Sequence, residues 1–129
     1  MLKTEIKAKW LHELRHGGHE QVCFTLKGLK PDGTAGYCCL GVLEEKVLGN
    51  ELEAIVLDTE AEGDLGYEGP KGVYEGPKGV YDYIKTIVIG DEHLVNDYMT
   101  RNDDDGWTFS EIADYIERTW NPDVDETVE

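Results

Sequence analysis

The stretch Gly36-Tyr-Cys-Cys-Leu-Gly-Val-Leu-Glu-Glu-Lys46 (GYCCLGVLEEK) places two adjacent cysteines between an aromatic residue and a helical pattern. We predict a helix from Cys38 to about Leu48, closed by Gly49-Asn50, because glycine suits a helix C-terminus. Adjacent side chains on a helix point about 100° apart, so one thiol faces the core and the other a second packing surface or a pocket. Free cysteine is often buried, so we interpret the pair as packing. A reactive thiolate at the helix N-terminus is the alternative.

The hydrophobic pattern outside this stretch predicts both helices and strands. Apolar residues recur at helical spacing over three further ranges, 3–16, 91–100 and 108–120. They follow a strand pattern over 21–27, 52–57 and 80–84, with another apolar run at 87–89 and a polar loop at 101–106. The fold class expected from this order is α+β. Three or four helices pack on a small, mainly antiparallel sheet, with helices at both chain ends.

The length of 129 residues favours one domain, which we place at residues 1–121. The heptapeptide YEGPKGV occurs twice in succession, at 67–73 and 74–80, within an exposed loop expected near 63–80. The repeated tyrosines and lysines could form a contact surface. A duplication tolerated in an exposed loop is the interpretation that we favour, because loops accept insertions readily. Residues 122–129 are acidic and predict a disordered tail.

The charge is unevenly distributed along the chain. Of the net charge of −16, residues 1–50 contribute +1 (seven Lys/Arg, six Asp/Glu) and residues 51–129 contribute −17 (five and 22). This asymmetry indicates a surface that repels nucleic acid, one that imitates it, or simply a soluble surface. No apolar run approaches about 18 residues, and the first residues lack an apolar signal core. We therefore expect a cytoplasmic protein without membrane contact.

Metal and catalytic sites find little support in the sequence. His12 and His16 are four residues apart on the first helix and His19 follows, but solvated surface histidines are the simpler interpretation. Adjacent cysteines cannot easily both bind a tetrahedral zinc ion. Residues 102–106 (NDDDG) fail as a calcium loop, because the twelfth position counted from Asp103 is not glutamate. We expect no metal, no cofactor and no enzymatic activity.

Four sequence blocks carry a resemblance to a known family. They are Trp10 with Leu14-Arg15 and Gln21, then Tyr37-Cys-Cys-Leu-Gly-Val-Leu43, Met99 with Asn102-Asp103, and Phe109-Ser-Glu-Ile-Ala-Asp-Tyr-Ile-Glu117. This order resembles a family of small, mostly uncharacterised phage and prophage proteins with a Tyr-Cys-Cys-Leu-Gly-Val block and a C-terminal Asn-Asp…Phe-x-x-Ile-Ala helix. His16 and His19 stand where that family has Ser and Tyr. Residues 51–90 have no counterpart in the pattern.

The resemblance implies a phage-encoded protein in the host cytoplasm that blunts host immunity. In one mode it is a sponge that sequesters a nucleotide immune signal without cleaving it, using aromatic and cationic residues. The ligand-binding residues expected in that mode are Trp10, Arg15, Tyr37, Arg101 and Asn102. A homo-oligomer fits this mode, since sponges commonly build pockets between protomers. In the other mode the acidic half imitates DNA and binds a host restriction or CRISPR-type protein. Neither mode involves direct nucleic-acid binding.

Overall fold

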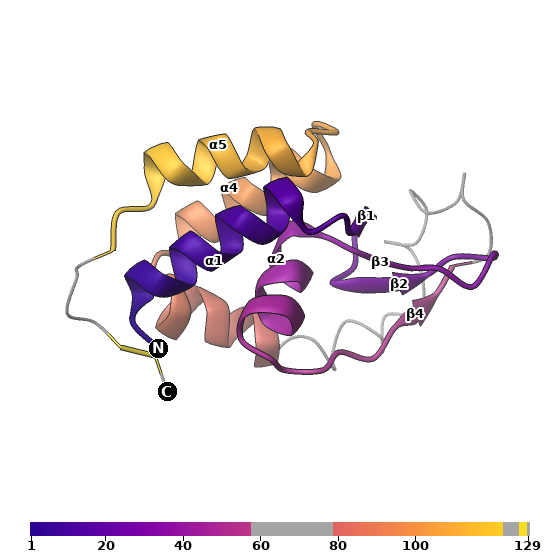
Figure 1. Ribbon diagram of the computed structural model, residues 1–129, viewed down its shortest axis with the longest axis horizontal. Coiled ribbons are helices and arrows are strands. Elements are labelled where there is room, and N and C mark those ends of the chain that lie inside the picture. Colours follow the sequence, from indigo (N-terminus) through magenta and orange to yellow (C-terminus); the bar gives the residue numbers. More distant parts are fainter. Residues whose placement is uncertain (58–78, 123–126, 129) are drawn as a thin grey trace.

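The computed structural model describes residues 1–57, 79–122 and 127–128. The helices gather at one end of the molecule and a small sheet extends from the other (Figure 1). Both termini lie at the helical end (Figure 1). There the Met1 ammonium donates to the Val128 carbonyl oxygen (3.2 Å), and the Val128 N–H donates to the Met1 carbonyl oxygen (2.8 Å). The two ends of the described chain are therefore fastened to each other.

Three helices lie where the sequence predicts them. They are α1 (Lys3–His16), α4 (Glu92–Asp103) and α5 (Phe109–Thr119). The Asp91 side chain caps α4 by accepting from the Leu94 N–H, and Thr108 and Glu111 form the expected capping box of α5. α4 ends at Asp103 instead of about Thr100, so the first half of the predicted 101–106 loop is helical.

The Cys-Cys segment also forms a helix, as predicted. α2 (Cys39–Gly41) continues directly into a π-helix, η1 (Val42–Val47). Gly49 follows with φ +80°, the left-handed conformation that a glycine after a helix adopts most easily. With the helix that starts at residue 79, the described part of the chain has five helical segments instead of three or four.

The sheet is mixed, which corrects the prediction of a mainly antiparallel one. Its order is β1-β3-β2-β4, formed by β1 (Glu20–Gln21), β2 (Lys27–Leu29), β3 (Ala35–Tyr37) and β4 (Ile55–Val56). Only the β2–β3 hairpin is antiparallel, whereas β1–β3 and β2–β4 are parallel. β4 enters after the α2–η1 helix, and a helical connection of this kind permits parallel pairing. Alternation along one strand carries no information on the direction of its neighbours.

The predicted strand over 21–27 is wrong across its middle. Only Gln21 and Lys27 belong to strands, and Phe24 has φ +65°, which breaks the extended conformation between them. Val22 and Leu26 are buried as the alternation predicts. The interruption has a tertiary cause, because side chains of α4 bind the backbone of Val22 and Phe24.

The predicted strand over 80–84 is also wrong. Residues 79–83 are helical and continue into the π-helix η3 (Ile84–Val88), which takes up most of the 87–89 run. Val80, Ile84 and Val88 are four residues apart, so the sequence fits a helix as well as a strand. Ile84 and Val88 are both completely buried, as residues four apart on one side of a helix can be, and this burial agrees with the helical period.

Some predictions fall outside the described residues. Apart from residues 79 and 80, which begin a helix, the repeat-bearing loop near 63–80 lies there. Most of the predicted tail, 122–129, lies there too. Three tail residues are described: Pro122, Thr127, which forms a β-bridge with Leu2, and Val128, which is buried.

The core is organised around Trp10 of α1, which is completely buried. Its ring makes edge-to-face contacts with Trp120 (centroids 6.1 Å apart) and Tyr98 (5.9 Å). Tyr98 contacts Tyr115 (5.9 Å), and Tyr115 contacts Trp107 (5.5 Å), in the same manner. A chain of five aromatic rings therefore runs from the core to Trp107, which is partly exposed.

We expect Gly41→Ala to destabilise the protein by about 2 kcal/mol or more. An added Cβ would lie 1.9 Å from the Leu26 carbonyl oxygen, a backbone atom that cannot move aside easily. Urea unfolding followed by circular dichroism measures the change. Gly79→Ala is the control, since its Cβ would meet nothing within 4 Å. Equal stability of the two variants would show that α2 does not pack this closely.

Candidate functional site

The side chain of Asn102 joins three segments of the chain in the interior. It is completely buried and makes four hydrogen bonds. Its amide nitrogen donates to the Val22 carbonyl oxygen (2.9 Å) and to Asp103 Oδ1 (2.8 Å). Its amide oxygen accepts from Gln21 Nε2 (2.9 Å) and from the Cys39 N–H (3.3 Å). All the hydrogen-bonding capacity of a carboxamide is used here, and we call this arrangement the Asn102 junction.

Further hydrogen bonds extend the Asn102 junction. Gln21 Nε2 also donates to the Trp107 carbonyl oxygen (2.7 Å), and Cys23 Sγ lies 3.2 Å from the Asn102 carbonyl oxygen. The Phe24 N–H donates to Asp103 Oδ1 (2.9 Å), and burial raises the pKa of the Asp103 carboxyl. Three of the four sequence blocks that carry the resemblance, represented by Gln21, Cys39 and Asn102-Asp103, therefore meet at one interior place.

Both thiols of the cysteine pair are buried, as the packing interpretation predicts. Cys39 is completely inaccessible, and Cys38 is 4% exposed. Burial raises the pKa of Cys38 to about 12 and that of Cys39 well above its ordinary value. A thiolate is the nucleophilic form, so neither sulfur is activated for catalysis near neutral pH.

Two of the five residues expected to bind a ligand are part of this interior. Trp10 donates its indole N–H to the Cys39 carbonyl oxygen (2.9 Å), and Asn102 accepts from the N–H of the same residue. Both side chains are 0% exposed. Their contacts hold α1, α2 and α4 together and leave neither group facing outward.

The two arginines of the expected site are on the surface in separate ion pairs. Arg15 of α1 reaches α5, where its Nη2 lies 2.7 Å from Asp114 Oδ1 and 2.6 Å from Glu117 Oε1. Arg101 binds Asp105 (Nη1–Oδ2, 2.5 Å) and Asp97 (Nη2–Oδ1, 3.2 Å), one turn away on either side. Carboxylates therefore already occupy the positions that phosphate oxygens would take.

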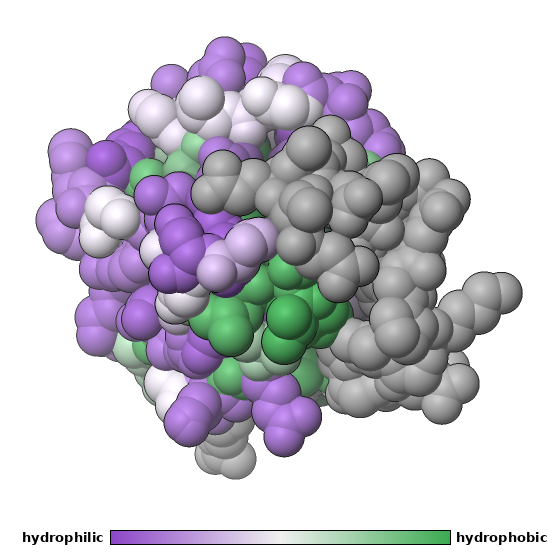
Figure 2. Space-filling view, turned by 90° about the vertical axis from the view of Figure 1, so that its right-hand side faces the viewer, coloured by the Kyte–Doolittle hydropathy of each residue, from purple (hydrophilic) through white to green (hydrophobic). Residues whose placement is uncertain are grey.

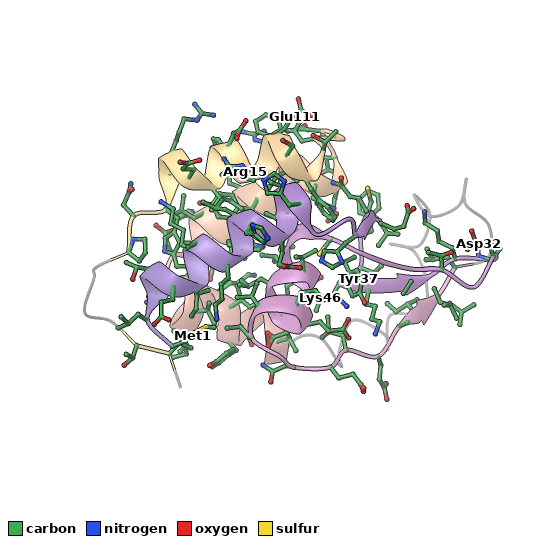
Figure 3. The ribbon with its side chains drawn as sticks, viewed as in Figure 1. Met1, Arg15, Asp32, Tyr37, Lys46 and Glu111 are labelled. Atoms are coloured by element: carbon green, nitrogen blue, oxygen red, sulfur yellow. The ribbon has the colours of Figure 1, made fainter. Side chains whose placement is uncertain are left out.

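Tyr37 lies in a third environment. Lys46 and Lys27 place their Nζ atoms 5.2 and 5.7 Å from its ring centroid, and Figure 3 shows Tyr37 and Lys46 side by side. Burial, with a hydrogen bond to Glu45, raises the pKa of Tyr37 to about 12. Burial alone would raise the pKa of Glu45, but hydrogen bonds from Lys27 and Tyr37 hold it at about 2. The ring is only 7% exposed, which leaves little of its face for stacking.

Charged and aromatic groups gather on the surface that joins the end of α4 to α5. We call it the α4–α5 face; its members are Asp97, Arg101, Asp104, Asp105, Trp107, Glu111, Asp114, Tyr115, Glu117 and Arg118. The Arg101 guanidinium lies over Trp107 (5.1 Å) and Tyr115 (5.6 Å). Figure 3 shows Glu111 at the outer edge of this face.

Sequence reasoning selected Arg101 but not its aromatic partners. The Arg118 guanidinium also lies over the Tyr115 ring, 5.6 Å from its centroid. The Tyr115 hydroxyl donates to Asp97. The signals available were Trp107 directly after the acidic loop and the i, i+4 spacing of Asp97, Arg101 and Asp105. That spacing predicts paired charges on one side of a helix.

Two other surface features deserve comparison with this face. An open groove lies between the start of α4 and the end of α5, lined by Ile89, Gly90, Asp91, Leu94, Thr119, Trp120, Asn121 and Pro122. Its acidic residue, Asp91, already caps α4. Figure 2 shows a hydrophobic patch at the sheet end of the molecule. Separately, Val56 on the edge strand β4 is 71% exposed. The groove has one aromatic residue, Trp120, which is only 4% exposed, so it offers less aromatic surface and charge than the α4–α5 face.

Comparisons of the chain with protein-family models, curated proteins and solved structures found no match. Among residues 1–57, 79–122 and 127–128, no group of three or more His, Cys, Asp or Glu side chains is arranged to hold a metal ion. His12 and His16 do approach each other, with ring centroids 5.3 Å apart. Within the same ranges, no helix combines the length and the apolar character that crossing a bilayer requires.

We expect Asn102→Ala to lower the free energy of unfolding by about 2–4 kcal/mol. The substitution leaves the Val22 carbonyl, the Gln21 amide and the Cys39 N–H without their buried partner. Chemical denaturation measures the loss. Asn96→Ala, at an exposed position of the same helix, is the matched control and should change stability by less than about 0.5 kcal/mol. A loss at Asn102 as small as the control's would show that the junction is dispensable.

We expect iodoacetamide at pH 8 to label Cys23 in the native protein and to leave Cys38 and Cys39 unlabelled. Cys23 is partly exposed, whereas the pKa of Cys38 is about 12, so its thiolate stays scarce even as the pH rises to about 9. Mass spectrometry after timed quenching counts the labels. Cys23→Ser should remove the fast label, and urea should expose all remaining thiols. Fast native labelling of either adjacent cysteine would refute the packing role.

Proposed function

We propose that the chain is a phage-encoded counter-defence protein that acts by binding and not by catalysis. Its acidic half docks onto the cationic nucleic-acid-binding surface of a host defence protein, such as a restriction or CRISPR-type nuclease. The assignment to phage rests on the sequence resemblance. The mode of action rests on the charge of residues 51–129, net −17, and on where the described carboxylates lie.

The observation that carries the proposal is the excess of carboxylates on the α4–α5 face. Six acidic residues lie there against two arginines of the face and Arg15, which reaches it from α1. Glu111, Asp114 and Glu117 are three residues apart and exposed on α5. The helix rise places successive members about 4.5 Å apart along the axis, each turned by about 60° around it. Such a row offers a cationic surface a dense line of negative charge.

The buried thiols support a binding role over a catalytic one. The sulfurs of Cys38 and Cys39 are held protonated by burial, and Asp103 is engaged by the Phe24 N–H and the Asn102 amide. These are the groups whose chemistry would otherwise favour covalent or acid–base catalysis. Their contacts within the Asn102 junction account for them structurally.

Nucleotide sequestration is the second candidate, and the observation that favours it is the pair of lysines over Tyr37. Lys46 lies 3.8 Å from Glu45, longer than the 2.8 Å contact between Lys27 and the same carboxylate. A phosphate could therefore attract Lys46 more easily than Lys27. Calorimetry with cyclic and ADP-ribose-type nucleotides tests this candidate, and recovery of the intact ligand distinguishes binding from cleavage.

The proposed function predicts inhibition of DNA cleavage by at least one enzyme in a panel of restriction and CRISPR-type nucleases. The double variant Asp104→Lys/Asp105→Lys should weaken inhibition by at least about tenfold, because it reverses charge on the α4–α5 face. Added salt should weaken wild-type inhibition in the same direction. Cleavage of a labelled duplex is the measurement.

Glu51→Lys/Glu53→Lys is the control, with the same change in net charge at exposed positions beside β4. It should retain nearly full inhibition. Equal losses in the two double variants would contradict a specific face, and no inhibition across the panel would contradict the proposed function.

A further inference from the structure

We infer that Trp107 and Tyr115 form the anchoring centre of the docking surface and receive an arginine- or lysine-rich segment of the partner. The inference rests on the proposed function and goes beyond it by naming the residues at the centre of the contact. Three observations support it: the contacts that fix Trp107, the partly exposed rings and indole N–H that a partner can reach, and the charges around the two rings.

Trp107 is held rigidly although it lies in a loop. Its N–H donates to the Arg101 carbonyl oxygen (3.0 Å), and its carbonyl oxygen accepts from Gln21 Nε2 (2.7 Å). Its ring meets Tyr115 edge to face at 5.5 Å, at the outer end of the aromatic chain that begins at Trp120. A side chain fixed in this way loses little conformational freedom when a partner binds, which favours affinity.

The side chains at this place are of the types that dominate binding energies at protein interfaces. Trp, Tyr and Arg are enriched at such hot spots, and here Trp107, Tyr115 and Arg101 lie in mutual contact. Trp107 and Tyr115 are each partly exposed. Among the residues that the structure describes, no hydrogen-bond acceptor is recorded for the Trp107 indole N–H, which leaves a donor for a partner carbonyl.

The charges around the two rings favour a cationic partner. Arg101 is already balanced by Asp97 and Asp105, so it adds little net attraction for an anion. In the described ranges no ion pair is recorded for Asp104 or Glu111, which flank Trp107 on either side in sequence. A partner arginine can pair with these carboxylates while its apolar stem covers the indole ring.

Intrinsic tryptophan fluorescence tests the inference with a ten-residue oligoarginine peptide as the probe. Trp10 and Trp120 are 0% and 4% exposed, so a change in emission on binding reports mainly Trp107. We expect a saturable change in the wild type and none in Trp107→Phe. A ten-residue oligoglutamate peptide should produce no change, because the carboxylates repel it.

Backbone amide chemical shifts locate the peptide without any substitution. The largest shifts should fall on residues 101–118; largest shifts on Glu51, Glu53 or the acidic stretch 58–68 would overturn the inference. Trp107→Leu should weaken peptide binding and nuclease inhibition by about tenfold. Thermal unfolding shows whether that variant is folded. If it is not, the chemical-shift map of the unsubstituted protein still locates the peptide.

The two proposals fail in different ways. Nuclease inhibition that is unchanged in Trp107→Phe and Trp107→Leu would refute the anchor and leave the proposed function standing. Peptide binding at Trp107 together with no inhibition of any nuclease would refute the proposed function, and with it the assigned class of partner.

Discussion

The four hydrogen bonds of the Asn102 side chain are the constraint on which the rest of the structure depends. One carboxamide satisfies the Val22 carbonyl, the Gln21 amide and the Cys39 N–H, which come from segments far apart in sequence. Each of these groups is costly to bury without a partner, by about 1–3 kcal/mol. Few other side chains could therefore replace Asn102, and the positions of β1, α2 and α4 are determined together.

This arrangement gives the residues of the cysteine motif and their partners a structural role in the interior. Trp10, Gln21, the cysteine pair and Asn102-Asp103 use their polar atoms on one another. What remains for contact with other molecules is the outer surface, where carboxylates already pair with Arg15 and Arg101. A surface of that kind attracts cations more readily than phosphates. For this reason we propose docking on a basic protein ahead of nucleotide sequestration.

The helices could be predicted from the sequence because their determinants are local. Asp91, Thr108 and Glu111 cap helices by contacts within a few residues, and the structure has those contacts. The 80–84 segment could not be assigned, because Val80, Ile84 and Val88 satisfy either period until their burial is known. The 21–27 strand failed because Asp103, remote in sequence, binds the Phe24 backbone. The placement of the expected ligand-binding residues was equally out of reach, because residue type gave no indication that Trp10 and Asn102 face inward.

The chain of aromatic rings connects the buried core to the α4–α5 face. Trp10 is fixed in the core by its hydrogen bond to Cys39, and successive edge-to-face contacts through Tyr98 and Tyr115 reach Trp107 at the surface. The loop that carries Trp107 is bound to the same junction through Gln21. A partner that presses on Trp107 therefore meets a group supported by the whole interior. The buried residues of the interior thereby hold the partly exposed Trp107 in place.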